Sequence, residues 1–250
     1  ISVAVFTNLG HEHLDYHGTF ENYRDAKRLL FKQANKNKKG LRTGIVNADD
    51  GVADYFAGDV ANPVRYGIKN GELKAENIEL TPAGSSYTAK NAEGSYKITC
   101  HLPGSFNVYN SLAAVGAGRA LGLTTEQIES GIESLHEVEG RMTRVDEGQD
   151  FAVIVDYAHT PESFDKIFAE VKPLTDKRLI CVFGSAGRRD EEKRAKQGAI
   201  AGKWCDIVIV NEEDDRDIDG EEIMRDIVGG AEQSGKVLNK DVLMVHNREE

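Results

Sequence analysis

Apolar positions follow two different arrangements along the chain, one before residue 140 and one after residue 150. In the later part, near-continuous apolar runs alternate with stretches of helical periodicity. Runs of this kind are typical of parallel strands covered by helices on both faces. The pattern predicts strands at 151–156, 178–184, 205–211 and 242–246, with helices at 161–171, 191–203 and 220–234.

The earlier part mixes helices with short alternating strands. We expect a strand at 1–7, a helix at 20–34 that begins after Thr19 as its N-cap, and a strand within 41–50. Short β runs separated by Gly, Asn and Ser follow, which is the pattern of a β-meander. The remaining predicted elements are the meander at 64–102 and two helices at 107–121 and 124–135, the second capped by Thr124 or Thr125.

These two patterns predict an α/β chain with two domains, residues 1–139 and residues 140–250. The boundary is placed at Gly140, where the segment 136–145 interrupts the helical pattern. The later domain is expected to be a Rossmann-like parallel sheet. In such sheets ligands bind at the carboxyl ends of the strands. The polar clusters at 156–159, 184–190 and 211–216 lie at these ends.

Composition narrows the class of protein. The net charge is −11, which argues against a general nucleic-acid binder, because that function needs a basic face. No apolar run reaches the roughly 18–20 residues that cross a bilayer, and no signal-peptide pattern is present. We therefore expect a cytoplasmic protein with small-molecule substrates and neither a nucleic-acid nor a membrane partner. Cys100, Cys181 and Cys205 form no CxxC pair, which suggests neither a zinc site nor a disulfide framework.

The segment TNLGHEHLDYHG, residues 7–18, concentrates groups that could bind a metal. It contains His11, His13 and His17 together with two acidic residues, directly after a predicted strand. The alternative is that the histidines only form hydrogen bonds within the loop. Zinc also remains open, although nothing in the spacing defines a tetrahedral set.

Read with the following residues, TNLGHEHLDYHGTFENYRDAK resembles the Mur ligase family pattern T-N-L-x-x-D-H-L-D-Y-H-G followed by Y-x-x-A-K. Four further blocks resemble family signatures in the same order: LPGSFNVYNSLAA, GRMTRV, VDYAHTPESF and VFGSAGRRDEEKR. The resemblance implies an ATP-dependent amide ligase of peptidoglycan synthesis. Such an enzyme adds diaminopimelate or lysine to UDP-MurNAc-L-Ala-D-Glu through an acyl phosphate. The motifs DYAHTP and HLDYHG favour the branch of the family that forms the tripeptide.

The resemblance implies catalytic and metal-binding roles for His13 and Lys27. In that branch the histidine binds Mg²⁺ and the lysine is carbamylated, which replaces a repelling ammonium with anionic oxygens. Glu12 stands where the family has aspartate and keeps the charge. Thr7 and Asn8 are the implied substrate-binding residues at the start of the block.

The next blocks imply an ATP site. By resemblance, Asn107 and Asn110 reach the nucleotide, Arg141 approaches the phosphates, Asp156 the ribose hydroxyls, and His159 lies in the same site. An amide can both donate to and accept from an adenine edge.

Each of these roles has a structural alternative. Lys27 could be an exposed helix lysine that contacts Tyr23 one turn earlier. Asn107 could cap its helix, and Asp156 could cap the helix that begins at Pro161.

The last blocks imply a site for the incoming amino acid at Arg189 and Arg216. Ala186 and Arg188 depart from the family's Gly and Asp around the first of these. Before Arg216, diaminopimelate-adding members carry D-N-P, whereas this chain has Glu213, Asp214 and Asp215. The added negative charge disfavours a second carboxylate and favours lysine. Alternatively, the two aspartates only face solvent.

The resemblance covers the later part of a P-loop-type central ATPase domain and most of the C-terminal domain. The sequence contains no G-x-x-x-x-G-K-[ST] loop. By resemblance, that loop, the UDP-binding domain and the final G-K-G-H-E block lie outside these residues, so we expect this fragment alone to be inactive. Two alternatives stay open: a folylpolyglutamate or cyanophycin synthetase-like ligase, and a non-catalytic nucleotide-binding module.

Overall fold

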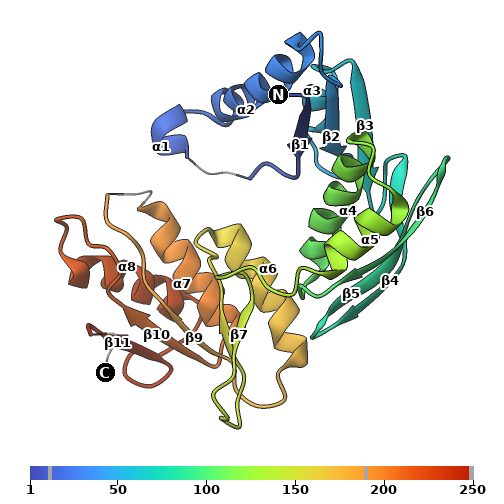
Figure 1. Ribbon diagram of the computed structural model, residues 1–250. Coiled ribbons are helices and arrows are strands. Elements are labelled where there is room, and N and C mark those ends of the chain that lie inside the picture. Colours follow the sequence, from blue (N-terminus) through green and yellow to red (C-terminus); the bar gives the residue numbers. More distant parts are fainter. Residues whose placement is uncertain (11–12, 189–190, 248–250) are drawn as a thin grey trace. The chain divides into compact units, whose positions relative to one another are not determined.

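The computed structural model describes residues 1–10, 13–188 and 191–247. Contacts divide the chain into two compact units, Ile1–Asp156 and Tyr157–Glu250, and each unit is described by itself (Figure 1). This division falls later than the predicted boundary at residue 140, because the segment up to Asp156 groups with the first unit.

The first unit contains a six-stranded mixed sheet in the order β1-β2-β3-β4-β5-β6. Its first four strands pair in parallel, and β4, β5 and β6 form an antiparallel meander, as the alternation within residues 64–102 predicts. The strands are β1 (Val3–Phe6), β2 (Thr43–Asn47), β3 (Asn62–Gly67), β4 (Leu73–Thr81), β5 (Gly84–Asn91) and β6 (Gly94–Cys100).

Helices cover both faces of the parallel part of this sheet. Ile45 of β2 packs in a core with the helices α4 and α5, whereas its neighbour Val46 packs in a second core with α2 and α3. Successive side chains of a strand point to opposite faces, so a strand covered on both sides is apolar at consecutive positions. The helices are α1 (Leu14–His17), α2 (Phe20–Lys36), α3 (Ala53–Ala57), α4 (Ser105–Ala120) and α5 (Thr125–Glu133).

Two helix starts agree with the predicted caps. The Thr19 hydroxyl accepts a hydrogen bond from the Asn22 amide at the start of α2. Thr124 caps α5 in a reciprocal pair with Gln127, so the first of the two predicted threonines is the cap. Both hydroxyls satisfy backbone amides that the helix itself leaves unpaired.

The second unit has a three-stranded parallel sheet in the order β11-β10-β9. Its core combines this sheet with three helices, in agreement with the predicted parallel-sheet domain. The elements are α6 (Pro161–Val171), the short 3₁₀ helix η1 (Lys172–Leu174), β9 (Ile180–Phe183), α7 (Glu192–Trp204), β10 (Ile207–Asn211), α8 (Gly220–Gln233) and β11 (Val242–Val245).

One predicted strand of this sheet has a different partner. The run 151–156 contains β8 (Val153–Val155), which pairs antiparallel with β7 (Thr143–Val145) in a separate two-stranded ribbon. Apolar composition predicted the strand but not its partner. A turn that includes Gly148, with φ near 89°, brings the two short strands together.

Helices α7 and α8 cross with their backbones in close contact. A Cβ added at Gly198 of α7 would run into the carbonyl oxygen of Ile227, and one at Gly230 of α8 would run into that of Ala195. Only glycine fits at either position without moving a helix.

No helix in residues 1–10, 13–188 and 191–247 has both the length and the apolar character that crossing a membrane requires.

Candidate functional site

The predicted substrate-binding residues Thr7 and Asn8 directly follow β1, at the carboxyl end of the parallel part of the sheet. The side-chain amide of Asn47, at the end of β2, donates to the carbonyl oxygen of Thr7 at 2.7 Å. Asn8 is exposed. The backbone at this strand end is therefore held by the neighbouring strand while an exposed side chain follows it.

The predicted metal-binding residues His13 and Lys27 both lie against the ring of Tyr23. The His13 and Tyr23 ring centroids are 5.6 Å apart, and the Lys27 Nζ lies 4.8 Å from the Tyr23 centroid. His17 contacts the same ring at 5.1 Å. The structure thus gathers these groups around one buried aromatic side chain, and the alternative contact of Lys27 with Tyr23 is also present.

The backbone around His13 is unusual. His13 has φ near 58°, in the left-handed region, immediately before the short helix α1. His11 and Glu12 lie outside the described residues. Within the described part, no three His, Cys, Asp or Glu side chains are grouped so that they could hold a metal ion. A lysine carbamate is not among these side chains.

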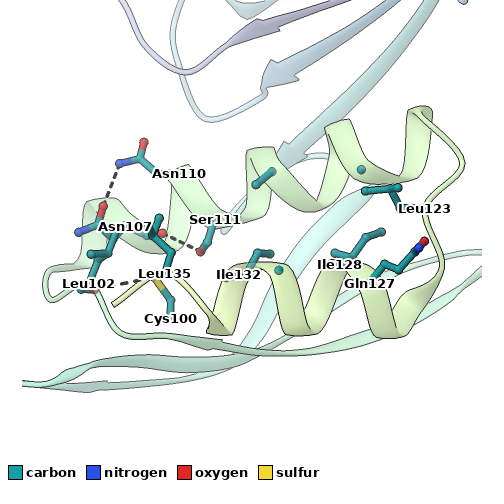
Figure 2. A pocket seen from close by; sticks show the side chains of 13 residues that line it. Cys100, Leu102, Asn107, Asn110, Ser111, Leu123, Gln127, Ile128, Ile132 and Leu135 are labelled. Carbon is teal, nitrogen blue, oxygen red and sulfur yellow. Dashed lines mark hydrogen bonds between the residues drawn. The ribbon is translucent and has the colours of Figure 1, made fainter. Parts of the chain in front are cut away.

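Asn107 and Asn110, the predicted nucleotide-binding residues, line a pocket of about 320 Å³ between α4 and α5. Asn107 is buried and donates from Nδ2 to the Pro103 carbonyl at 2.7 Å, and its Oδ1 accepts from Asn110 Nδ2 at 3.0 Å. Asn107 does not cap the helix: Gly104 is the N-cap residue. Figure 2 shows the two amides at the end of the pocket near Leu102.

The rest of the pocket wall is mainly apolar. Side chains such as Leu123, Ile128 and Ile132 line it away from the two amides (Figure 2). An apolar slot with a few polar groups at one end is the usual form of a site for a small planar ligand.

Arg141 and Asp156 are brought together by one tight turn. The Asp156 Oδ2 accepts the backbone amide of Met142 at 2.8 Å. Gly140 and Met142 both have positive φ, near 71° and 53°. Asp156 therefore stabilises the turn that presents the exposed Arg141. It does not cap α6, whose N-cap is Thr160.

His159 lies in the second unit, in the segment before α6. Its Nδ1 lies 3.0 Å from the Tyr157 carbonyl oxygen, and its own carbonyl accepts from Lys193 Nζ at 3.5 Å. The side chain is exposed. These contacts do not test whether His159 lies beside a nucleotide, so that role stays a prediction.

The loops that follow β9 and β10 contact each other. The Gly187 amide donates to the Asp214 carbonyl at 2.8 Å, and Arg188 pairs with Asp217 at 3.1 Å. Arg216 Nε donates to the Asp214 carboxylate at 2.8 Å. The structure thus joins two of the three polar strand ends expected in the second domain. Arg189 lies outside the described residues.

Sequence reasoning missed Asp49 and Tyr109. The two Asp49 oxygens accept the backbone amides of Ile68, Lys69 and Asn70 and, at 3.0 Å, the Tyr109 hydroxyl. Burial alone would raise the pKa of Asp49, but these hydrogen bonds hold it below its usual value. The sequence signal that could have indicated Asp49 is the pair of adjacent aspartates, Asp49 and Asp50, after the buried strand β2.

The chain consists of two consecutive α/β units, and this fold is shared with solved ligase structures. The crystal structure of MurF ligase from Thermotoga maritima in complex with ADP superposes with a TM-score of 0.70 at 18% identity, covering 97% of this chain and 52% of that one. The Mur ligase middle domain matches residues 1–118, and the Mur ligase glutamate ligase domain matches residues 140–250. The chain belongs to the Mur ligase family.

Two curated relatives are similar to most of this chain. UDP-N-acetylmuramyl-tripeptide synthetase from Roseiflexus sp. is 41% identical over 256 residues, 98% of this chain and 50% of the relative. UDP-N-acetylmuramoyl-L-alanyl-D-glutamate–2,6-diaminopimelate ligase from Geobacillus kaustophilus is 40% identical over 232 residues, 91% of this chain and 47% of the relative. The chain spans about half the length of these relatives.

Proposed function

We propose that the full-length protein is an ATP-dependent amide ligase that adds diaminopimelate or lysine to UDP-MurNAc-L-Ala-D-Glu. ATP phosphorylates the peptide carboxylate, which gives an acyl phosphate and ADP. The amine of the amino acid then attacks the acyl carbon, and phosphate leaves as the amide forms. The substrate class follows the names of the similar proteins, which are a tripeptide synthetase and a diaminopimelate ligase.

The observation that carries this proposal is the meeting of His13 and Lys27 at the Tyr23 ring. Lys27 is exposed, so its amine can react with CO₂ to form a carbamate and release a proton. His13 nitrogen and carbamate oxygen are a suitable partial ligand set for Mg²⁺. When bound, the ion supplies positive charge that neutralises the transferring phosphoryl group.

The nucleotide end of the site uses the polar rim of the pocket. Asn107 and Asn110 would contact the adenine edge, with the base in the apolar slot between α4 and α5. Arg141 would pair with the phosphates, since a guanidinium forms two parallel hydrogen bonds with such groups. Asp156 would act first by holding the turn of Arg141, with any ribose contact as a second role.

The incoming amino acid would lie near the joined loops after β9 and β10. Arg216 and Arg189 are the candidate partners of its carboxylate, and Asp214 would determine how much of the Arg216 charge is available. By resemblance to the family, His159 would contact the nucleotide and not the amino acid.

The test is amide formation by the full-length protein. ATP, Mg²⁺, UDP-MurNAc-L-Ala-D-Glu and either diaminopimelate or lysine are supplied, and ADP and the UDP-MurNAc-tripeptide are measured together. We expect equal amounts of both products. Release of ADP without tripeptide in every combination of substrates would contradict the proposal.

A further inference from the structure

We propose that the turn at residues 47–50 is a positioning element that aligns the Thr7–Leu9 segment and helix α4 with each other. The names of the ligands at these two places rest on the proposed function. The alignment itself rests on hydrogen bonds from side chains of one short turn to two separate parts of the first unit.

The first set of bonds holds the segment after β1 on both sides of Asn8. Asn47 Nδ2 donates to the Thr7 carbonyl at 2.7 Å, and the Leu9 amide donates to Asp50 Oδ2 at 3.1 Å. A backbone fixed immediately before and after one residue leaves that residue few orientations. The Cα–Cβ direction of the exposed Asn8 is therefore defined.

The side chains that form these bonds are themselves fixed. Asn47 is 7% exposed, and its Oδ1 accepts the Asp49 amide at 3.0 Å. Asp50 Oδ1 accepts the Val52 amide at 3.0 Å, which leaves Oδ2 for Leu9. Each residue thus uses one atom to order the turn and another to hold the neighbouring segment. Such preorganisation lowers the entropy cost of binding.

The buried residue Tyr66 also holds the backbone at the end of β1. Tyr66 of β3 is fully buried, and its hydroxyl lies 3.4 Å from the Phe6 carbonyl as donor. Burial, together with the negative charge of Asp50, raises the pKa of Tyr66 far above its usual value, so the hydroxyl keeps its proton.

The second set of bonds connects the turn to α4. Asp49 Oδ2 accepts the Tyr109 hydroxyl at 3.0 Å, and Tyr109 lies between Asn107 and Asn110 in the helix. Burial and the Asp49 carboxylate raise the pKa of Tyr109 to about 12, which keeps this donor protonated. The bond fixes α4 at the level of its two amides.

The two sets meet in adjacent residues. Asp49 holds the nucleotide helix and Asp50 holds the segment of Thr7 and Asn8, so their relative position depends on a single peptide unit. Phosphoryl transfer between two bound substrates is sensitive to small displacements of either one. Placing both supports on neighbouring residues reduces this displacement.

A merely structural role and a positioning role predict different results. If the bonds only stabilise the fold, each substitution should lower stability without selecting a ligand. If they position, loss of the Tyr109 bond should weaken nucleotide binding alone. Loss of the Asn47 side chain should affect the Thr7–Leu9 side more than nucleotide binding, because Asn47 also accepts the Asp49 amide.

The experiment uses full-length Tyr109→Phe and Asn47→Ala. Asn62→Ala is the matched control, since Asn62 Nδ2 donates to the Leu41 carbonyl at 2.9 Å at the other end of the same strands. The Kd for MgADP, the KM for UDP-MurNAc-L-Ala-D-Glu and hydrogen exchange at the Leu9 amide are measured in each protein.

We expect Tyr109→Phe to raise the Kd for MgADP about fivefold, with the dipeptide KM within twofold of the unsubstituted protein. We expect Asn47→Ala to raise that KM about fivefold and the Leu9 exchange rate about tenfold, with the Kd for MgADP raised no more than about twofold through the lost contact to the Asp49 amide. Asn62→Ala should change none of these.

The positioning role would be overturned if either substitution changed the Kd for MgADP and the dipeptide KM by equal factors, or if the changes were no larger than in the Asn62→Ala control. If Asn47→Ala does not fold, Tyr109→Phe, which removes a single oxygen, decides the outcome through MgADP. If the unsubstituted protein binds MgADP but forms no amide, the proposed function fails, whereas the binding and exchange measurements still decide the positioning role.

Discussion

Arg216 Nε donates to the Asp214 carboxylate at 2.8 Å, so the two residues neutralise each other within one loop. Both side chains remain partly exposed. A carboxylate that arrives from a substrate must therefore compete with Asp214 for this guanidinium. Asp214 therefore does not only face solvent, and under the proposed function this contact would give it an influence on amino-acid choice.

Asp214→Asn should shift the amino-acid preference of the full-length enzyme toward diaminopimelate. Removing the internal carboxylate frees Arg216 for the second carboxylate of that substrate, and we expect the ratio of kcat/KM for diaminopimelate to that for lysine to rise about fivefold. A competition assay with both amino acids measures the ratio. An unchanged ratio would show that Asp214 and Arg216 do not select the substrate.

Lys27→Ala should abolish ligase activity in the full-length protein and leave folding intact. The exposed side chain contributes little to packing, whereas the proposed carbamate would hold a catalytic cation. Activity should fall at least a hundredfold, and acetate should restore part of it by filling the same place. Lys32→Ala, at another exposed position of α2, is the control and should remain active. Near-normal turnover by Lys27→Ala would rule out the carbamate.

Gly198→Ala should destabilise the protein by about 2–3 kcal/mol, because the added methyl group would overlap the Ile227 carbonyl. Gly229→Ala is the matched control in α8: a Cβ there meets no atom within 4 Å. It should stabilise the helix by about 0.5–1 kcal/mol. Urea unfolding of the three proteins compares these effects, and equal stabilities would contradict the close crossing.

Asp49→Asn should cost about 1–3 kcal/mol at neutral pH, because an amide oxygen cannot replace a carboxylate that accepts several donors. The pKa of Asp49 is lowered in the fold from an ordinary value of 3.8, so its contribution is full above that value and is lost as pH falls through the lowered pKa. The difference between the two proteins should therefore shrink as the pH falls below about 4. Denaturant titrations across this range measure it, and a difference independent of pH would exclude the charge as its source.

Local signals predicted the elements well. Thr19 and Thr124 combine a capping hydroxyl with the start of an apolar period, and both cap helices as expected. The consecutive apolar residues of β2 likewise indicated a strand covered on both faces. These features depend on residues close in sequence, where propensity and periodicity act directly.

Pairing over long distances could not be predicted in the same way. The residues of β8 and its neighbours do not indicate that it pairs with β7 and not with the parallel sheet. Strand pairing depends on contacts between segments that are separate in the sequence. The sequence did not indicate that the Asp156 carboxylate holds the Met142 amide, and Thr160, not Asp156, caps α6; the ribose contact of Asp156 stays a prediction. The Asp49–Tyr109 bond joins residues that no local period connects.

The close crossing of α7 and α8 at Gly198 and Gly230 limits which substitutions the second unit can accept. Because a side chain at Gly198 or Gly230 would collide with the backbone of the facing helix, we expect few substitutions to be tolerated at these two positions. The loops after β9 and β10, where Arg188 and Asp214 lie, carry no such restriction from the crossing. Under the proposed function, a lineage could therefore change its amino-acid preference by exchanging loop residues while it keeps the helix pair beneath them.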